Sequence, residues 1–261
     1  MTRRGMAVAK QRLDELLIAR GLAESLPKAQ SLIMAGDVFA GEHRLAKAGD
    51  KLASDIEIRV RGREHPWVSR GGLKLDHGLT HFGVDPKGCV CLDVGASTGG
   101  FTDVLLSRGV ARVTAVDVGY GQLAQKLRAD ERVVVLERTN ARHLTAVDVD
   151  RPVDLIVCDA SFIGLRTILP AALALAAPRA RVIALIKPQF EASRDQIGAK
   201  GVVTDPAVHA EICRDIKAWF AALPGWRVMG LTPSPITGRE GNVEFLIAAE
   251  RDSACPDRNQ A

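Results

Sequence analysis

Four charged residues stand where the sequence pattern otherwise predicts apolar side chains or strand ends. Asp159 and Lys187 each follow an apolar run typical of a buried strand, and Glu244 lies in the apolar segment VEFLIAA. Lys74 lies on a predicted helix. Because a buried unpaired acid is energetically costly, Glu244 should have a basic partner. Two amines and two carboxylates brought together could form a structural ion-pair network or a reaction centre. We favour the reaction centre because functional sites gather perturbed charges.

A glycine-rich segment, CLDVGASTGGF at residues 91–101, predicts the opening of a nucleotide-binding βαβ unit. We expect a strand over Cys89–Val94, a glycine loop, and a helix over Phe101–Arg108. The spacing G-x-x-x-G-G differs from the dinucleotide pattern G-x-G-x-x-G, and Asp93 would repel a pyrophosphate but attract an ammonium or sulfonium group. S-adenosylmethionine carries both cations and no phosphate, so it fits better. The alternative is a strand–turn–helix whose glycines only make the turn.

Polar residues at later strand ends complete the expected cofactor site. Asp117 ends the next predicted strand, Arg112–Val118, 24 residues after Asp93, near the distance expected of a ribose-binding acid. Asn140 follows the third strand and is our candidate for the adenine ring, with an Asx turn as the alternative. The expected cofactor contacts are Asp93, Gly95, Ala96, Ser97, Thr98, Gly99, Gly100, Phe101, Asp117, Val118, Asn140, Ala141 and Asp159.

Strands alternate with helices over residues 69–250, which predicts one α/β domain followed by a polar tail, 251–261. The remaining strands are expected over Arg132–Leu136, Val153–Cys158, Arg181–Ile186, Arg227–Thr232 and Asn242–Ala248, and the helices over Ser69–His81, Leu165–Leu175 and Pro206–Ala222. Gln189–Val203 is polar and is expected to be a mobile flap. Ligands bind beyond the carboxyl ends of strands in open α/β sheets, so Asp159 and Lys187 should lie at one cleft.

Composition limits the class of protein. The 261 residues have room for one large and one small domain, and a hydrophobic fraction of 47% suffices for a packed core. No apolar run reaches about 18 residues, so no membrane span is expected. The first residues contain no apolar stretch of the secretory kind, and five cysteines without metal-ligand spacing suit a reduced cytosol. We therefore expect a cytoplasmic protein that holds no metal.

The positive charge lies in the N-terminal part. Residues 1–70 hold 13 Lys and Arg against 9 Asp and Glu, whereas the rest of the chain holds 22 of each. Two small helices, Arg12–Arg20 and one from Ser25 to Gly36, precede short strands within Asp37–Arg44 and Asp55–Val60. This pattern predicts a basic module over residues 1–64 that meets a polyanion, with residues 65–68 as linker. The candidate RNA contacts are Arg3, Arg4, Arg12, Arg20, Lys28, Arg44 and Arg70.

Two resemblances sharpen these expectations. Residues 10–62, notably RLDELLIARGLAES and PKAQSLIMAGDVFAG, resemble the S4 RNA-binding domain, although Leu26-Pro27 stands where a serine–arginine pair is common. The whole chain resembles the TlyA family of ribosomal RNA methyltransferases in SRGGLKLDHGL, CLDVGASTGGFTDVLL, VDVGYGQL, ERTNAR, LIKPQFE and GNVEF. Its second part is similar to FtsJ-type ribose 2′-O-methyltransferases, whose Lys-Asp-Lys-Glu set falls on Lys74, Asp159, Lys187 and Glu244.

The resemblance implies a class I, Rossmann-like methyltransferase domain behind a small α+β S4-like domain. It further implies S-adenosylmethionine as donor and a cytidine 2′-hydroxyl of 16S or 23S ribosomal RNA as acceptor, with ribosomal subunits as partners. A lysine is a base only if its pKa falls from about 10.4, and burial and a second ammonium both favour this. We hypothesise that Lys187 is the base, with Lys74 lowering its pKa and helping to hold the acceptor. Asp159 would orient Lys187 and the methyl donor, and Glu244 would hold Lys74 or the hydroxyl.

Other readings of the chain remain open at this point. The protein could be a non-catalytic RNA-binding or ribosome assembly factor, and its N-terminal module could instead bind another protein. Relatives have been called haemolysins, so a membrane-active protein is a further alternative, although the sequence offers no amphipathic membrane helix. We expect a monomer.

Overall fold

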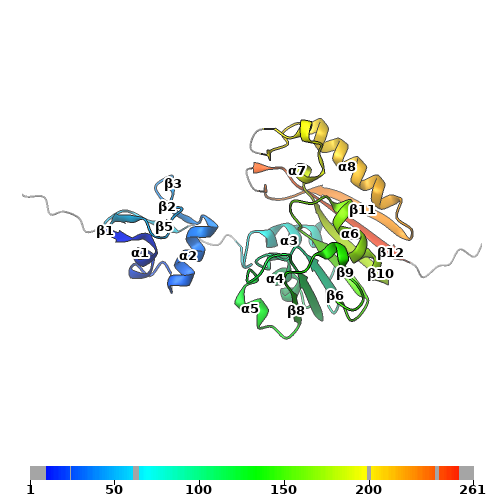
Figure 1. The fold of residues 1–261 in the computed structure, drawn as a ribbon, viewed down its shortest axis with the longest axis horizontal. Helices are drawn as coiled ribbons and strands as arrows, with labels where there is room; N and C mark the ends of the chain where they lie inside the picture. The colour runs from blue at the N-terminus through cyan, green and yellow to red at the C-terminus, as the bar shows by residue number, and fades with distance from the viewer. Residues whose placement is uncertain (1–9, 24, 61–64, 199–200, 239–240, 253–261) are drawn as a thin grey trace, which may run out of the picture. The chain divides into compact units, whose positions relative to one another are not determined.

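The computed structural model describes residues 10–23, 25–60, 65–198, 201–238 and 241–252 (Figure 1). The chain divides into two compact units, Met1–Pro66 and Trp67–Ala261. Arg3 and Arg4, two of the candidate RNA contacts, lie outside the described residues, as does most of the predicted tail.

The N-terminal unit packs two helices on short strands. Helices α1 (Leu13–Ala19) and α2 (Leu26–Ala35) enclose a small core that includes Leu13, Leu17 and Ile33. Ser25 caps α2 by accepting a hydrogen bond from the Lys28 amide at 3.4 Å, and Gly36 ends it with φ of +79°. Strands β2 (Val38–Ala40), β3 (His43–Arg44) and β5 (Arg59–Val60) form one sheet, and β1 (Lys10–Arg12) pairs with β4 (Lys51–Ala53).

The prediction of a strand over Asp55–Val60 is mostly wrong, because only Arg59 and Val60 form a strand, which pairs with β2. Ile56 and Ile58 instead pack on the core of the unit, so their alternation with charged residues reflects burial without strand pairing. Strands β1 and β4 were not expected from the pattern. They are three residues each, too short for periodicity to distinguish them from loops.

The C-terminal unit is built on a seven-stranded sheet in the order β11-β12-β10-β9-β6-β7-β8. Its strands are β6 (Val90–Val94), β7 (Arg112–Val116), β8 (Val133–Leu136), β9 (Val153–Cys158), β10 (Ala176–Ile186), β11 (Trp226–Pro233) and β12 (Phe245–Asp252). The five strands from β10 to β8 are parallel, and β12 is antiparallel to both β10 and β11. The predicted α/β class is confirmed, and the sheet is mostly parallel.

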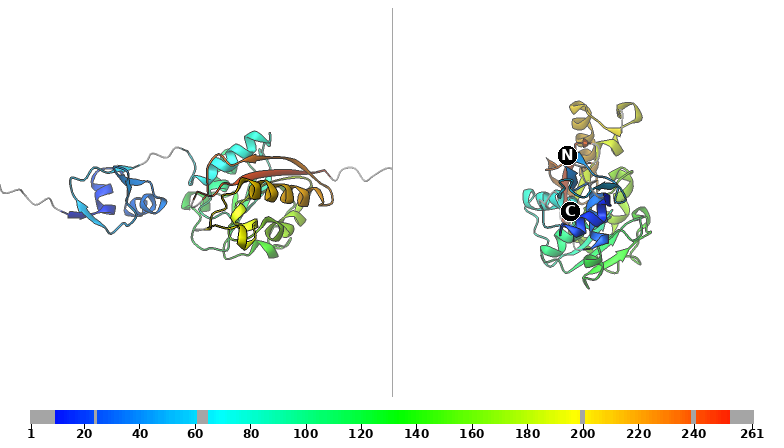
Figure 2. Two further views of the ribbon diagram at one scale, coloured as in Figure 1. Left: turned by 90° about the horizontal axis from the view of Figure 1, so that it is seen from above. Right: turned by 90° about the vertical axis from the view of Figure 1, so that its left-hand side faces the viewer.

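Helices cover both faces of this sheet (Figure 2). Helices α3 (Gly71–His81), α4 (Gly100–Ser107) and α5 (Gln125–Arg128) contribute to one core, and α6 (Leu165–Ala174) and α8 (Pro206–Ala221) to the other. The strands are buried on both faces, as expected of a parallel sheet, and neighbouring residues such as Cys91 and Leu92 enter opposite cores.

Several predicted boundaries shift. The strand expected from Arg181 begins at Ala176, with a register shift between these two residues, and the last strand begins at Phe245, so that Glu244 precedes it. The same strand continues to Asp252, past the expected domain end at residue 250. The expected flap over Gln189–Val203 contains the short helix α7 (Pro188–Glu191) and a turn of 3₁₀ helix at Arg194–Gln196.

The expected linker and the start of α3 also need correction. Trp67 and Val68 pack on the core of the C-terminal unit, and the Val68 amide donates to Asp103 Oδ2 at 2.7 Å. Ser69 does not cap α3, because the helix begins after Arg70 without a side-chain cap. Gly72 instead allows close packing, since a Cβ at this position would lie 2.4 Å from the Trp67 ring.

Candidate active site

A cleft of about 1060 Å³ opens at the carboxyl ends of the parallel strands. Its walls come from the glycine loop after β6, the turns after β7, β8 and β9, the start of α3, and the segment before β12. This volume is at the upper end of the range for small-molecule sites, so a cofactor and an acceptor nucleoside could both enter. The predicted placement of a site at this edge of the sheet agrees with the geometry.

The glycine loop forms one wall of the cleft. Gly95 has φ of +84°, and a Cβ on it would lie 2.8 Å from Cα of Ala160. Gly99 has φ of +96°, and a Cβ there would meet the side chain of Leu127 at 2.2 Å. Both positions therefore require glycine, for backbone conformation and for space. The result is a shallow cradle of backbone beside Ala96, Ser97 and Thr98, which a ligand can approach closely.

Asp117 and Asn140 line the cleft as predicted. Asp117 accepts hydrogen bonds from the Ser97 amide at 2.8 Å and the Gly119 amide at 2.7 Å, and this ties the glycine loop to the turn after β7. Asn140 Oδ1 accepts from the Arg142 amide at 3.1 Å, so the proposed Asx-type turn is present and the residue also faces the cleft. The Asp117 carboxylate and the Asn140 side-chain amide are thus both held in place by backbone N–H groups.

Asp93 is placed differently from the expectation. It is fully buried under the glycine loop and does not line the cleft. Its Oδ2 accepts a hydrogen bond from Thr102 Oγ1 at 2.7 Å, while Oδ1 has no partner among the described residues. Burial raises the pKa of Asp93 to about 7, and Asp159 and Asp117 add to the rise. Its expected direct contact with a cofactor is therefore corrected, because strand β6 turns this side chain inward. Gly99 is likewise outside the cleft wall.

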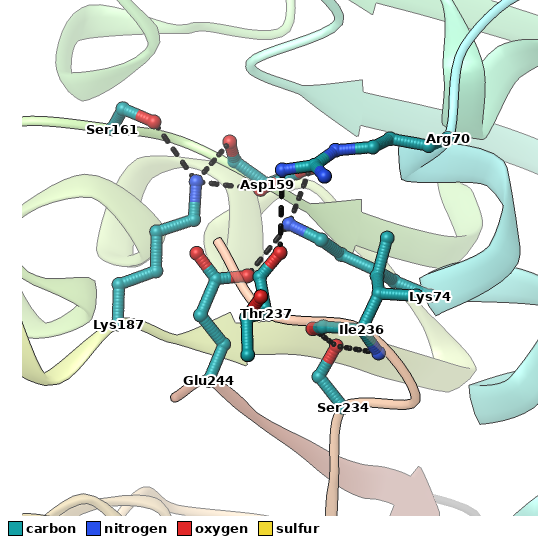
Figure 3. Close-up of polar contacts among 9 residues, drawn as sticks. All are labelled: Arg70, Lys74, Asp159, Ser161, Lys187, Ser234, Ile236, Thr237 and Glu244. Atoms are coloured by element: carbon teal, nitrogen blue, oxygen red, sulfur yellow. Dashed lines mark hydrogen bonds and ion pairs between the residues drawn. The ribbon is translucent and has the colours of Figure 1, made fainter. Parts of the chain in front are cut away.

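The four charged residues singled out in the sequence converge in this cleft (Figure 3). Lys187 Nζ lies 2.6 Å from Asp159 Oδ1, and Lys74 Nζ lies 3.8 Å from Asp159 Oδ2. Lys74 Nζ also donates to Glu244 Oε2 at 2.6 Å. Asp159 therefore lies between the two amines, and Glu244 pairs with the second. The predicted basic partner of Glu244 is Lys74.

Neighbouring strands explain how Asp159 and Lys187 meet. Strands β9 and β10 are parallel neighbours, with Cys158 opposite Ala184. Asp159 directly follows β9 and Lys187 directly follows β10, so both lie at the carboxyl edge of the sheet. Lys74 reaches the site from α3, whose Leu75 and Leu79 pack on the sheet. Glu244 reaches it from the other direction, at the start of antiparallel β12.

The four side chains are withdrawn from water. Lys74, Lys187 and Glu244 are buried, and only Asp159 is partly accessible. A charged group that is buried from water is energetically costly unless it is paired with an opposite charge. Here two positive and two negative groups face one another. The cluster can therefore hold a polar substrate group and exchange a proton with it in a site of low dielectric constant.

The loop between β11 and β12 supports Glu244. The Ser234 amide donates to the Glu244 carbonyl at 2.8 Å, and Ser234 Oγ donates to the Ile236 carbonyl at 2.7 Å. Arg70 Nη2 donates to the Thr237 carbonyl at 3.3 Å across the cleft mouth (Figure 3). Arg70 therefore belongs to the C-terminal unit and lies beside the charged cluster.

The remaining basic candidates differ in whether their side chains are already held by other groups of the N-terminal unit. Arg12 is engaged by buried Asp14, with Nη2 to Oδ2 at 2.7 Å, and Arg20 donates to the Ile56 and Ser54 carbonyls. These two side chains hold the N-terminal unit together, because they satisfy a buried acid and two backbone groups. Arg44 is exposed, its guanidinium lying over Gly36, and Lys28 is partly exposed in the first turn of α2. These two remain available to an anion.

Some cleft residues were missed by sequence reasoning. Gln122 accepts a hydrogen bond from Ser97 Oγ at 3.3 Å, and Ser161 accepts one from Lys187 Nζ at 2.9 Å. Asn242, in the cleft wall, accepts from the Val203 amide at 3.3 Å and donates to the Gly201 carbonyl at 3.2 Å. Only Ser161 carried a usable signal, its position two residues after a strand-end acid.

No group of three or more His, Cys, Asp or Glu side chains among the described residues could hold a metal ion. No helix in the described part of the chain is long and apolar enough to span a membrane.

Comparison with known proteins follows the division seen in the structure. The family described as FtsJ-like methyltransferase matches residues 67–251. A Bacillus subtilis (strain 168) protein named "Putative rRNA methyltransferase YqxC" is 49% identical over 93% of this chain and 86% of its own length. The Mycobacterium tuberculosis (strain H37Rv) protein named 16S/23S rRNA (cytidine-2'-O)-methyltransferase TlyA is 46% identical over 91% of this chain and 89% of its own.

A solved structure supports the same fold over nearly the full chain. The protein described as "Putative hemolysin from Streptococcus thermophilus" is 41% identical, with a TM-score of 0.73 over 94% of this chain and 90% of that one. The likeness extends through both compact units.

Proposed function

The chain belongs to the FtsJ-like methyltransferase family, and we propose that it transfers the methyl group of S-adenosylmethionine to a cytidine 2′-hydroxyl in ribosomal RNA. The observation that carries this proposal is the meeting of Lys74, Asp159, Lys187 and Glu244 beside the glycine loop. The substrate and position on the ribose come from the names of close relatives.

The cleft suits S-adenosylmethionine. The cradle at Gly95 admits a ligand only because no Cβ fills it, and Asp117 and Asn140 face the same space with oxygen and amide groups. Asp117 would hold the ribose hydroxyls, Asn140 the adenine, and the backbone beside Ala96 and Ser97 the remainder of the molecule. When bound, this cofactor supplies a methyl group on a positively charged sulfur, and transfer leaves the electron pair of the broken C–S bond on that sulfur.

The charged cluster would prepare the acceptor. A ribose hydroxyl is a poor nucleophile and must lose its proton as its oxygen bonds to the methyl carbon. We assign Lys187, as a neutral amine, to take that proton, with Asp159 holding Nζ in place. Lys74, held by Glu244, would hydrogen-bond the same hydroxyl oxygen as negative charge develops on it. Alignment of two bound reactants can lower the barrier by roughly 7–11 kcal/mol.

We propose that the N-terminal unit is an S4-like RNA-binding domain. The excess positive charge of the chain lies in residues 1–70, and Lys28 and Arg44 are accessible at opposite ends of α2. Phosphate contacts by such residues bind RNA without reading sequence. Because ribosomal RNA is the proposed substrate, the protein would act in the cytoplasm.

Methyl transfer to defined RNA tests this proposal. The protein is incubated with labelled S-adenosylmethionine and ribosomal subunits from a strain that lacks the gene, and 2′-O-methylated positions are mapped. We expect label at one or a few cytidines. Binding of subunits without transfer would favour a non-catalytic assembly factor, and leakage of liposomes at matched protein concentration, with no transfer, would favour a membrane-active protein.

A further inference from the structure

Three oxygen atoms surround the amine of Lys187, and two of them accept hydrogen bonds from it. Nζ lies 2.6 Å from Asp159 Oδ1, donates to the Asp159 carbonyl at 3.0 Å, and donates to Ser161 Oγ at 2.9 Å (Figure 3). Asp159 Oδ1 lies close enough for an ion pair but accepts no hydrogen bond, so the amine donates to two oxygens. An ammonium group has three hydrogens and no lone pair, and both accepting oxygens suit its protonated form. Each hydrogen bond strengthens when the amine is charged, and the ion pair with Asp159 exists only then.

The three oxygen atoms belong to different parts of the chain. The carboxylate and carbonyl both belong to Asp159, which follows β9 and also faces Lys74. Ser161 belongs to the next turn, lies on the exposed side of the cleft, and is the acceptor that the Lys-Asp-Lys-Glu set does not include. One of the two hydrogen bonds of the amine thus depends on a residue that has been given no role.

The fold holds Ser161 opposite Lys187. Strands β9 and β10 pair in parallel with Cys158 opposite Ala184, and extending this register by three residues brings Ser161 beside Lys187. The turn that follows is held at a second point, because Glu191 Oε1 accepts from the Leu165 amide at 2.7 Å and the rings of Phe162 and Phe190 lie 5.1 Å apart. The segment after Lys187 is therefore joined to the segment after Ser161 at two further points.

We propose that Ser161 is a positioning residue for methyl transfer, whose hydroxyl accepts a hydrogen bond from Lys187 that strengthens as this amine takes the proton of the acceptor hydroxyl. This inference rests on the proposed function. The proton leaves the acceptor oxygen for Lys187 Nζ, and the Ser161 hydroxyl stabilises the ammonium that forms. Hydrogen bonds to charged groups are about twice as strong as neutral ones, so the contact favours proton uptake more than it favours the neutral amine.

Other charged groups near Lys187 would act on it in parallel. Asp159 contacts it directly, Lys74 and Glu244 complete the cluster, and Arg70 lies at the cleft mouth. The Cys158 thiol lies behind it at the end of β9, and burial raises the pKa of this thiol to about 12, so it stays neutral. The Ser161→Ala change leaves all of these groups in place and removes one hydroxyl.

The test compares Ser161→Ala and Ser161→Thr with wild type in single-turnover methyl transfer across a pH series. For Ser161→Ala we expect a maximal rate about tenfold lower or less, and an acid limb of the pH–rate profile moved to lower pH by about one unit, because the ammonium has lost an acceptor. Affinity for S-adenosylmethionine and for RNA should stay within about twofold of wild type. Ser161→Thr, which keeps the hydroxyl, should restore most of the rate.

A control variant and further measurements distinguish a wrong role for Ser161 from a wrong proposed function. Ser107→Ala removes an exposed hydroxyl from α4, outside the cleft, and should leave rate and profile unchanged. An unmoved acid limb in Ser161→Ala, or a full rate, would overturn the role of Ser161. Wild type that transfers no methyl to any ribosomal subunit would instead overturn the proposed function. Reduced cofactor affinity in both Ser161 variants would mean that the hydroxyl only supports the cleft wall, which also contradicts the inference.

Discussion

Replacing Asp93 by Asn should make the unfolding free energy of the C-terminal unit depend less on pH. Asp93 is fully buried, and burial raises its pKa from the ordinary 3.8 to about 7 in the folded protein. A neutral carboxyl is therefore favoured by the fold, and its contribution to stability is present at low pH and lost as pH rises through about 7. Asn is neutral at every pH and keeps an oxygen that can accept from Thr102.

The magnitude follows from the pKa difference. Between pH 5 and a folded-state pKa near 7, each pH unit changes the contribution of Asp93 by about 1.4 kcal/mol. From pH 5 to pH 8, wild type should thus lose about 3 kcal/mol relative to Asp93→Asn. An unpaired amide hydrogen of Asn at the site of Oδ1 costs about 1–3 kcal/mol, and that cost is the same at every pH.

Tryptophan fluorescence is a suitable probe, because Trp67, Trp219 and Trp226, the three tryptophans of the chain, all belong to the C-terminal unit. Urea unfolding of both proteins without cofactor at pH 5, 6, 7 and 8 gives the difference directly. Asp85→Asn, at an exposed position, serves as control and should show a difference that does not change with pH. A constant difference between wild type and Asp93→Asn would refute the view that the fold keeps this carboxyl neutral.

Three further predictions concern the cleft and the N-terminal unit. Lys187→Ala should bind S-adenosylmethionine normally, while its rate of methyl transfer falls by about 10²–10⁴, because it removes the proton acceptor; near-normal turnover would exclude Lys187 as the base. Gly95→Ala should weaken cofactor affinity about tenfold or more in calorimetry, because its Cβ would lie 2.8 Å from Cα of Ala160, whereas Gly88→Ala, which has a similar φ and open space, should bind as wild type does. Lys28→Ala should reduce the slope of log affinity for RNA against log salt by about one, with exposed Lys87→Ala as control; an unchanged slope would mean that Lys28 meets no phosphate.

Much of the C-terminal unit could be predicted from local patterns. Apolar runs such as Val153–Cys158 are strands in the structure with the expected bounds, because a strand buried on both faces must be continuously apolar. Helix ends were less certain, since Ser69 lacks the capping contact that its position suggested. In the N-terminal unit the short strands were misjudged, because three residues carry too little periodicity to identify a pairing partner.

The basic candidates show where residue type alone misleads. Arg12 was expected to meet RNA, yet buried Asp14 engages its guanidinium, and hydrogen bonding to Arg12 lowers the pKa of Asp14. Arg20 donates to two backbone carbonyls of the same unit. A charge pattern reports how many positive groups are present, but only tertiary contacts determine which of them are already paired.

The sequence by itself determined the αβ alternation, the glycine loop and the residue types of the charged cluster, because these depend on local periodicity and on glycine's backbone freedom. Only the tertiary structure decided the distances. Lys74 and Glu244 are 170 residues apart in the chain and form a 2.6 Å pair, since α3 packs on the sheet and β12 enters it antiparallel. Strand order and register set those positions, as they turned Asp93 inward and placed Ser161 opposite Lys187, and no local pattern contains that information.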